Sequence, residues 1–408
     1  MMFKRQWRTF KLILTVIPLM LGHQLYAADQ IILGIVLVDI MKEITLSIFW
    51  SGLITTFFGV GILIGSMLAA YVVRRKGLKF TISVGLLGFS LFTFLTGFSL
   101  CIWDLLFYRI SMGIGEGIWN VAYYSVIGTF FAKKRGFANA IAGNMYLLGL
   151  LWAYPFSGII LVSSGSWRLP LHIFGLLGFF VLLLLLLTLR SDAWTTTPPQ
   201  TEANSERLLF VLKNRNVNSG CLMGIFNALL FFSVAGFYPT YSMLMLGFDS
   251  FQSSVLMSVQ SWLMFVTSPI ILFLSDRYGR RLFLYFTSLL SAIAVYFMFN
   301  LPRGNFALAA MASLFYGVAS AGGFPLLLAF VQDSVTGASI VPATSLFTVA
   351  FYIGTITAGP VTGYIISSLG WEHASLWLAL CCFMWFLIAV LTKPTQTHQR
   401  LNHSETSA

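Results

Sequence analysis

The chain alternates long apolar stretches with short polar segments, from its first residues almost to its last. Each apolar stretch has about 20 residues or more, the length at which an α-helix crosses the hydrocarbon core of a bilayer. These stretches lie near residues 12–38, 48–73, 80–99, 102–131, 137–162, 169–189, 218–245, 251–274, 282–300, 306–331, 341–368 and 373–391. They are too long and too continuously apolar for the strands of a membrane barrel. The pattern therefore predicts an all-α membrane protein with twelve transmembrane helices.

The longest polar stretch separates six of these segments from the other six. It contains TTTPPQTEANSER, whose paired prolines, threonines and mixed charges are typical of a linker. The expected parts are an N-terminal six-helix bundle at 1–190, a cytoplasmic linker at 191–216, a C-terminal six-helix bundle at 217–392 and a cytoplasmic tail at 393–408.

Matched positions indicate that the two halves are repeats. Gly77 and Gly279 are 202 residues apart, and Pro155 and Pro360 are 205 residues apart. A nearly constant offset predicts two parallel, pseudo-symmetric copies. In such an arrangement the substrate site lies at the interface of the copies, near the middle of the membrane.

Composition and charge agree with a membrane location. Hydrophobic residues make up 58% of the 408 residues and charged residues only 9%, too few to cover a water-soluble globule of this size. The net charge of +11 does not indicate nucleic-acid binding, because the basic residues form short clusters between apolar stretches. Twenty of the 24 Lys and Arg residues fall on the side that holds both chain ends, which places both termini in the cytoplasm. We expect a multi-pass protein of the plasma (inner) membrane.

The first apolar segment also has features of a secretory signal. Basic residues precede the run LILTVIPLMLG, and LYA at 25–27 has the small residues of a cleavage site. Apolar sequence resumes at once in IILGIVLV, and the segment is needed to complete the first half. We therefore expect it to be retained as the first helix.

Three charged residues lie well inside apolar segments, away from their ends, namely Asp29, Arg109 and Glu116. A charge at the middle of a bilayer costs about 2.5 kcal/mol or more, so such residues are candidates for function. Arg109 and Asp29 lie at comparable distances from the outer ends of their helices. Glu116 shares a helix face with Arg109 but lies about 10 Å deeper, too far for a direct ion pair. The equivalent positions of the second half hold Gly317 and Phe324, so we expect the coupling chemistry in the first half.

The segment SDRYGRR at 275–281 resembles the cytoplasmic signature of the major facilitator superfamily, which lies between the second and third helix of each half. The matching residues are Asp276, Arg277, Gly279, Arg280 and Arg281. The resemblance covers nearly the whole chain and implies two six-helix bundles, with a charge interaction of this Asp that holds one conformation closed. In the first half Gly77 matches Gly279, but Arg74 stands where the acidic residue is expected. The same lock is therefore in doubt for that half.

Within the superfamily, RISMGIGEG at 109–117 resembles the fourth helix of the anion:cation symporters and the Spinster-like transporters, where a Glu follows an Arg by seven residues. LYAADQIIL at 25–33 resembles their first helix, and FYPTYSML at 237–244 resembles their seventh. An Asp-Arg pair is common in that first helix. Here Asp29 is followed by Gln30, so the second cation is missing.

These residues predict a division of labour. The planar guanidinium of Arg109 would be shared between Asp29 and an anionic substrate, because it can bind a carboxylate with two hydrogen bonds. Glu116, buried and unpaired, would load and release a proton within reach of physiological pH. The resemblance implies the same roles. The alternative is a static Asp29–Arg109 pair that joins two helices, with Glu116 permanently protonated.

Neutral polar residues complete the candidate site. Gln30 can orient a substrate but adds no charge, which argues for a less anionic substrate or one that is not a carboxylate. His23 titrates near neutrality and is either a coupling residue or a hydrogen-bonded packing residue. The expected cavity-lining residues are Tyr26, Asn120, Tyr124, Asn227 and Tyr241. Each of them could instead bond across helices.

Together these features predict a secondary active transporter that moves a small organic solute, with an organic anion as the leading candidate, by proton-coupled symport and alternating access. The same fold allows a proton-driven efflux carrier for amphipathic compounds. A membrane enzyme or receptor is disfavoured, because the sequence has no H-E-x-x-H motif and no attached soluble domain. The four cysteines lack C-x-x-C spacing, so no metal is expected, and neither is a cofactor. We expect a monomer whose partners are the solute, protons and lipid.

Overall fold

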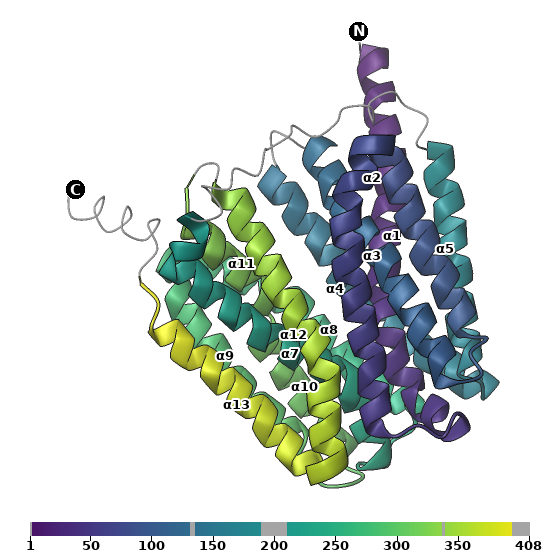
Figure 1. Cartoon of the computed structure of the whole chain (residues 1–408), viewed down its shortest axis with the longest axis vertical. Helices are drawn as coiled ribbons and strands as arrows, with labels where there is room; N and C mark the ends of the chain where they lie inside the picture. Colours follow the sequence, from purple (N-terminus) through teal and green to yellow (C-terminus); the bar gives the residue numbers. More distant parts are fainter. Residues whose placement is uncertain (1, 131–134, 189–209, 337–338, 394–408) are drawn as a thin grey trace.

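The computed structural model describes residues 2–130, 135–188, 210–336 and 339–393, and their regular structure is helical (Figure 1). The helices of the first half are α1 (Met2–Glu43), α2 (Ile48–Thr96), α3 (Ile102–Phe130), α4 (Arg135–Ser164) and α5 (Arg168–Thr188). The helices of the second half are α7 (Arg215–Leu244), α8 (Ser250–Tyr278), α9 (Arg280–Met298), α10 (Phe306–Ser320), α11 (Gly323–Asp333), α12 (Ile340–Leu369) and α13 (Trp371–Val390). The predicted all-α architecture is confirmed. Most of the predicted linker and tail lies outside the described residues, so the domain boundaries stay predictions.

The described residues contain ten helical stretches that are long and apolar enough to cross a membrane. This number differs from the twelve predicted segments because α2 contains two of them, 48–73 and 80–99, and because α3, which lies within the predicted segment 102–131, is not among the ten. A further difference lies in the span Phe306–Asp333, which the structure divides into α10 and α11. Each predicted segment nevertheless lies largely within a helix.

Two glycines at equivalent positions redirect the chain between consecutive spans. Gly77 has a φ of 78° inside α2, and Gly279 has a φ of 96° between α8 and α9. Residues with a side chain rarely adopt this left-handed backbone conformation, whereas glycine adopts it without a steric penalty. An added Cβ at Gly77 would meet no atom within 4 Å, so it is the backbone conformation and not crowding that requires glycine. The two matched glycines of the predicted repeat thus share a left-handed backbone conformation.

The helices of each half pack mainly against one another. α2 lies along α3, and α1 lies along α4 and α5; in the second half α13 lies along α9, and α10 along α8 and α9. In Figure 1 α2, α3 and α5 lie on one side of the molecule, and α9, α11 and α13 lie on the other. Contacts between the halves are made chiefly by α2 with α12, α4 with α8 and α1 with α7. Among these ten stretches the one in α1 is the most enclosed, with 78% of its most apolar segment buried.

The contact between α2 and α12 depends on two facing glycines. A Cβ added to Gly52 would overlap the carbonyl oxygen of Gly359, and a Cβ added to Gly359 would overlap that of Gly52. One turn further along, Thr56 Oγ1 donates to the carbonyl oxygen of Ile356 at 3.0 Å. These contacts lie near the end of the molecule where α1 turns into α2. Because the two backbones touch there, the halves are held together at this end.

Replacing Gly52 by alanine is expected to push α2 away from α12, since the new Cβ overlaps the Gly359 carbonyl. The separation would expose the neighbouring Ser51, which is buried. A cysteine placed at position 51, in a background where the exposed Cys101 is serine, should then react severalfold faster with a membrane-impermeant maleimide. The matched control is Gly236→Ala, because a Cβ at Gly236 meets no atom within 4 Å. Equal labelling rates in the two variants would contradict this account of the contact.

Candidate functional site

Two helices carry the charged residues that the sequence singles out. The enclosed helix α1 contributes Asp29, and α3 contributes Arg109 and Glu116. All three are buried, with 2% of Asp29, 2% of Arg109 and none of Glu116 exposed. Each must therefore find its partners inside the protein or in a ligand, and the two carboxyls can also take up a proton.

Arg109 has fewer partners than a buried guanidinium needs. Its Nη1 donates to the backbone carbonyl oxygen of Asp29 at 3.5 Å and lies 3.6 Å from Met112 Sδ. Its Nε and Nη2 are buried and have no partner. The predicted contact with Asp29 is therefore made through the backbone, and the three direct ion pairs found among the described residues do not include Arg109. Two donors are left for a ligand.

The Asp29 carboxylate is directed to Thr93 of α2 instead. Both of its oxygens lie within hydrogen-bond distance of Thr93 Oγ1, which also lies 2.8 Å from the carbonyl oxygen of Phe89. A hydroxyl has one proton to donate. When Thr93 donates it to Phe89, its hydrogen bond with Asp29 requires a proton on the carboxyl. Sequence reasoning missed Thr93, because nothing distinguishes it from the other threonines of apolar helices.

Glu116 lies at one end of a short hydrogen-bonded chain. Gln30 Nε2 donates to Glu116 Oε2 at 2.8 Å, and Tyr146 of α4 donates to Gln30 Oε1 at 2.9 Å. The expectation that Glu116 is unpaired is wrong, because one of its oxygens accepts a hydrogen bond from the Gln30 amide. Its other oxygen, Oε1, is buried without a partner. As expected, Glu116 forms no ion pair with Arg109 among the described residues.

His23 is enclosed by aromatic rings. It stacks on Tyr26 and Tyr123, with ring centroids 5.0 and 4.0 Å away, and meets the edge of Tyr124. Its Nδ1 accepts a hydrogen bond from Trp119 Nε1 at 3.4 Å. An indole N–H can only donate, so this nitrogen of His23 must carry no proton. The contacts favour the packing role over the coupling role that the sequence also allowed.

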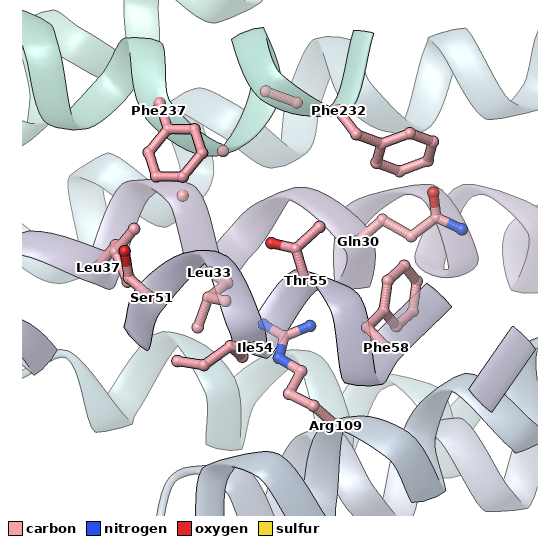
Figure 2. Close-up of a pocket in the computed structure, with 13 residues that line it drawn as sticks. Gln30, Leu33, Leu37, Ser51, Ile54, Thr55, Phe58, Arg109, Phe232 and Phe237 are labelled. Atoms are coloured by element: carbon pink, nitrogen blue, oxygen red, sulfur yellow. The ribbon is translucent and has the colours of Figure 1, made fainter. Parts of the chain in front are cut away.

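A pocket lies between the first-half helices and α7 (Figure 2). Gln30 and Arg109 reach it from α1 and α3, and Phe232 and Phe237 cover it from α7. Its remaining lining residues are Leu33, Gly34, Leu37, Ser51, Ile54, Thr55, Phe58, Ala235 and Gly236. The cavity volume is about 30 Å³, room for only a few water molecules in this conformation. A solute needs the halves to move apart.

The other predicted lining residues lie outside this pocket. Asn120 Nδ2 donates to the hydroxyl of Tyr352 at 3.4 Å and so links α3 to α12. Asn227 contacts Gly323, inside the second half, where an added Cβ would overlap its amide. Tyr241 stacks on Tyr238 and meets the ring of Trp371. The last two lie in packing contacts of the second half and are not brought to Arg109. Tyr26 and Tyr124, as described, belong to the rings around His23.

The signature segment of the second half forms a charge cluster. Arg280 pairs with Asp276 and with Asp333 of α11, at 2.8 Å from Nε to Oδ2, and its Nη1 donates to Ser275 at 2.9 Å. Arg281 donates to the carbonyl oxygen of Val390 at 3.2 Å. Arg277 lies over the ring of Tyr278. The cluster therefore joins α8, α9, α11 and α13. Sequence reasoning missed Asp333, which no motif marks.

Comparisons with known proteins agree with this architecture. Residues 19–259 and 220–408 match the model of the Major Facilitator Superfamily. Probable anion transporter 4, chloroplastic, of Arabidopsis thaliana is 29% identical over 191 residues, which cover 46% of this chain and 36% of that protein. The probable galactarate/D-glucarate transporter GarP of Escherichia coli (strain K12) is 27% identical over 194 residues, which cover 46% and 42%. The match thus spans less than half the length of either relative.

A solved structure extends the likeness to the whole fold. A bacterial homologue of the human lysosomal transporter Spinster, in an inward-facing and unoccupied conformation, matches with a TM-score of 0.77 at 17% identity. The match covers 93% of this chain and 95% of that one. At this identity the likeness supports the fold alone, whereas the family model extends over nearly the whole sequence. The chain therefore belongs to the Major Facilitator Superfamily and is a multi-pass membrane protein.

Proposed function

We propose that the protein is a secondary active transporter of a small organic anion, driven by proton symport. The observation that carries this proposal is the state of Arg109, whose Nε and Nη2 lie buried without partners beside a pocket between the halves. A permanent cation with two free donors fits an anionic group better than any neutral one. The names of the two relatives, a probable anion transporter and a probable galactarate/D-glucarate transporter, agree with an anionic solute.

Two buried carboxyls support the coupling to protons. Asp29 and Glu116 lie buried on neighbouring helices. A proton on Asp29 would complete its hydrogen bond with Thr93 when Thr93 donates to Phe89, and a proton on Glu116 would remove its buried charge. When an anion binds Arg109, the site gains negative charge in a region of low dielectric. A proton on either carboxyl offsets that charge, so that anion and proton enter together. Gln30 connects Glu116 to the pocket and can transmit the change.

Alternating access would use the contact between the two halves. In this proposal the six-helix bundles at 1–190 and 217–392 rock about the central pocket. The facing glycines Gly52 and Gly359 close the end that the charge distribution places outside the cell, with both termini in the cytoplasm. The protein would work as a monomer in the plasma membrane.

Glu116→Gln is expected to abolish proton-driven accumulation of an organic anion in right-side-out vesicles while leaving exchange of labelled for unlabelled anion in place. The reason is that an amide cannot gain or lose the coupling proton. Glu372→Gln is the matched control, because Glu372 lies exposed at the start of α13. Undiminished accumulation by Glu116→Gln would remove this residue from coupling, and accumulation only in inside-out vesicles would indicate export.

Arg109→Lys is expected to weaken anion binding by about tenfold or more, because an ammonium keeps the charge but cannot reproduce the planar pair of donors. Binding is measured by displacement on the purified full chain. Arg303→Lys makes the same change at an exposed residue and should leave affinity unaltered. If Arg109→Lys bound anions as well as the wild type, the guanidinium would not be the anion site.

A further inference from the structure

We infer that the pocket selects an apolar monocarboxylate over a dicarboxylate or a polyhydroxylated acid. This inference rests on the proposed function and deepens it, because it assigns the class of anion. Three properties of the pocket support it: the free edge of one guanidinium, the lack of a second cation and the apolar character of the walls.

The edge of the Arg109 guanidinium formed by Nε and Nη2 is complementary to one carboxylate. Nη1 is occupied by the Asp29 carbonyl oxygen, whereas Nε and Nη2 are both free. The N–H bonds of these two nitrogens are parallel within the guanidinium plane and are spaced to meet the two oxygens of a single carboxylate. Figure 2 shows the guanidinium directed toward Ile54 and Thr55 of α2. The anionic end of the solute would lie there.

A second carboxylate would find no cation. Arg109 is the one charged residue that lines the pocket, and all of the lining residues belong to the part of the chain that the structure describes. The neighbouring buried charges, Asp29 and Glu116, are acids that would repel another carboxylate. Gln30 stands where a second cation could reach the pocket, but it is neutral and its amide is engaged by Glu116 and Tyr146.

The walls favour an apolar body. Apolar residues make up most of the lining, six of them leucine, isoleucine or phenylalanine, with Phe232 and Phe237 facing the first-half helices. The polar side chains besides Arg109 are Gln30, Ser51 and Thr55, and Ser51 already donates to the carbonyl oxygen of Ile48 at 2.6 Å. A chain of hydroxyl groups would lose its water and gain few partners, which is unfavourable. An apolar carbon chain has no hydrogen bonds to water to lose when it moves from water into the pocket, so the same transfer is favourable for it.

Four six-carbon acids separate charge from polarity. Hexanoate has one carboxylate and no hydroxyl, adipate has two carboxylates, gluconate has one carboxylate with hydroxyls, and galactarate has two with hydroxyls. Their dissociation constants for the purified full chain are measured near neutral pH, where all four are ionised. Hexanoate is expected to bind about tenfold or more tightly than adipate and than gluconate, and galactarate is expected to bind weakest.

The other outcomes are distinct. Adipate or galactarate binding as tightly as hexanoate would overturn the single-carboxylate assignment, and gluconate doing so would overturn the apolar assignment; in both cases the proposed anion transport would stand. Failure of all four acids to bind folded protein would overturn the inference and the proposed function together.

A gain-of-function variant tests the missing cation directly. Gln30→Arg places a second guanidinium beside the pocket and is expected to improve adipate binding relative to hexanoate by about tenfold or more. Gln30→Met is the matched control, because it also breaks the hydrogen bonds to Glu116 and Tyr146 but adds no charge. A preference for adipate in both variants, or in neither, would contradict the role given to position 30. Should Gln30→Arg fail to fold, the comparison of the four acids on the wild type still decides.

Discussion

The site depends on a guanidinium that is held away from water with its hydrogen bonds incomplete. Arg109 cannot lose its charge, and two of its nitrogens have no acceptor. Burying such a group is unfavourable, and the protein offsets only part of this with the carbonyl oxygen of Asp29. An anion that supplies the missing acceptors would offset the remaining cost of burying the guanidinium. In the proposed function, the site therefore favours a ligand of one charge type, and the two unpartnered nitrogens of Arg109 select the solute.

Helix α1 makes this arrangement possible. Because it is enclosed by helices of both halves, it can present Asp29, Gln30 and His23 to three different surroundings within two turns. Asp29 faces Thr93 of α2, Gln30 faces Glu116 of α3, and His23 lies among aromatic rings. A shift of α1 relative to α2 or α3 would change the partners of both carboxyls at once. In the proposed mechanism, movement of the halves and protonation are connected through this one helix.

Much of the fold follows from the sequence, and less of the site does. Long, continuous apolar runs in a membrane form helices, and Gly77 and Gly279, which are matched in the sequence, share a left-handed backbone conformation. The buried charges were also found from their rarity. Their hydrogen-bond partners cannot be predicted in the same way, because helix periodicity gives the depth of a residue and its helix face but not how the helix is rotated relative to its neighbours. That is why Asp29 was assigned to Arg109 when it faces Thr93, and why the Gln30 contact with Glu116 was missed.

The central claim is that anion binding at Arg109 and proton binding at the neighbouring carboxyls are one event. It is tested most directly by the change in pH when hexanoate is added to concentrated, purified protein in weakly buffered solution. The account predicts that the protein takes up protons as the anion binds, with an amount that saturates along with binding. Saturable binding without any uptake of protons would contradict it.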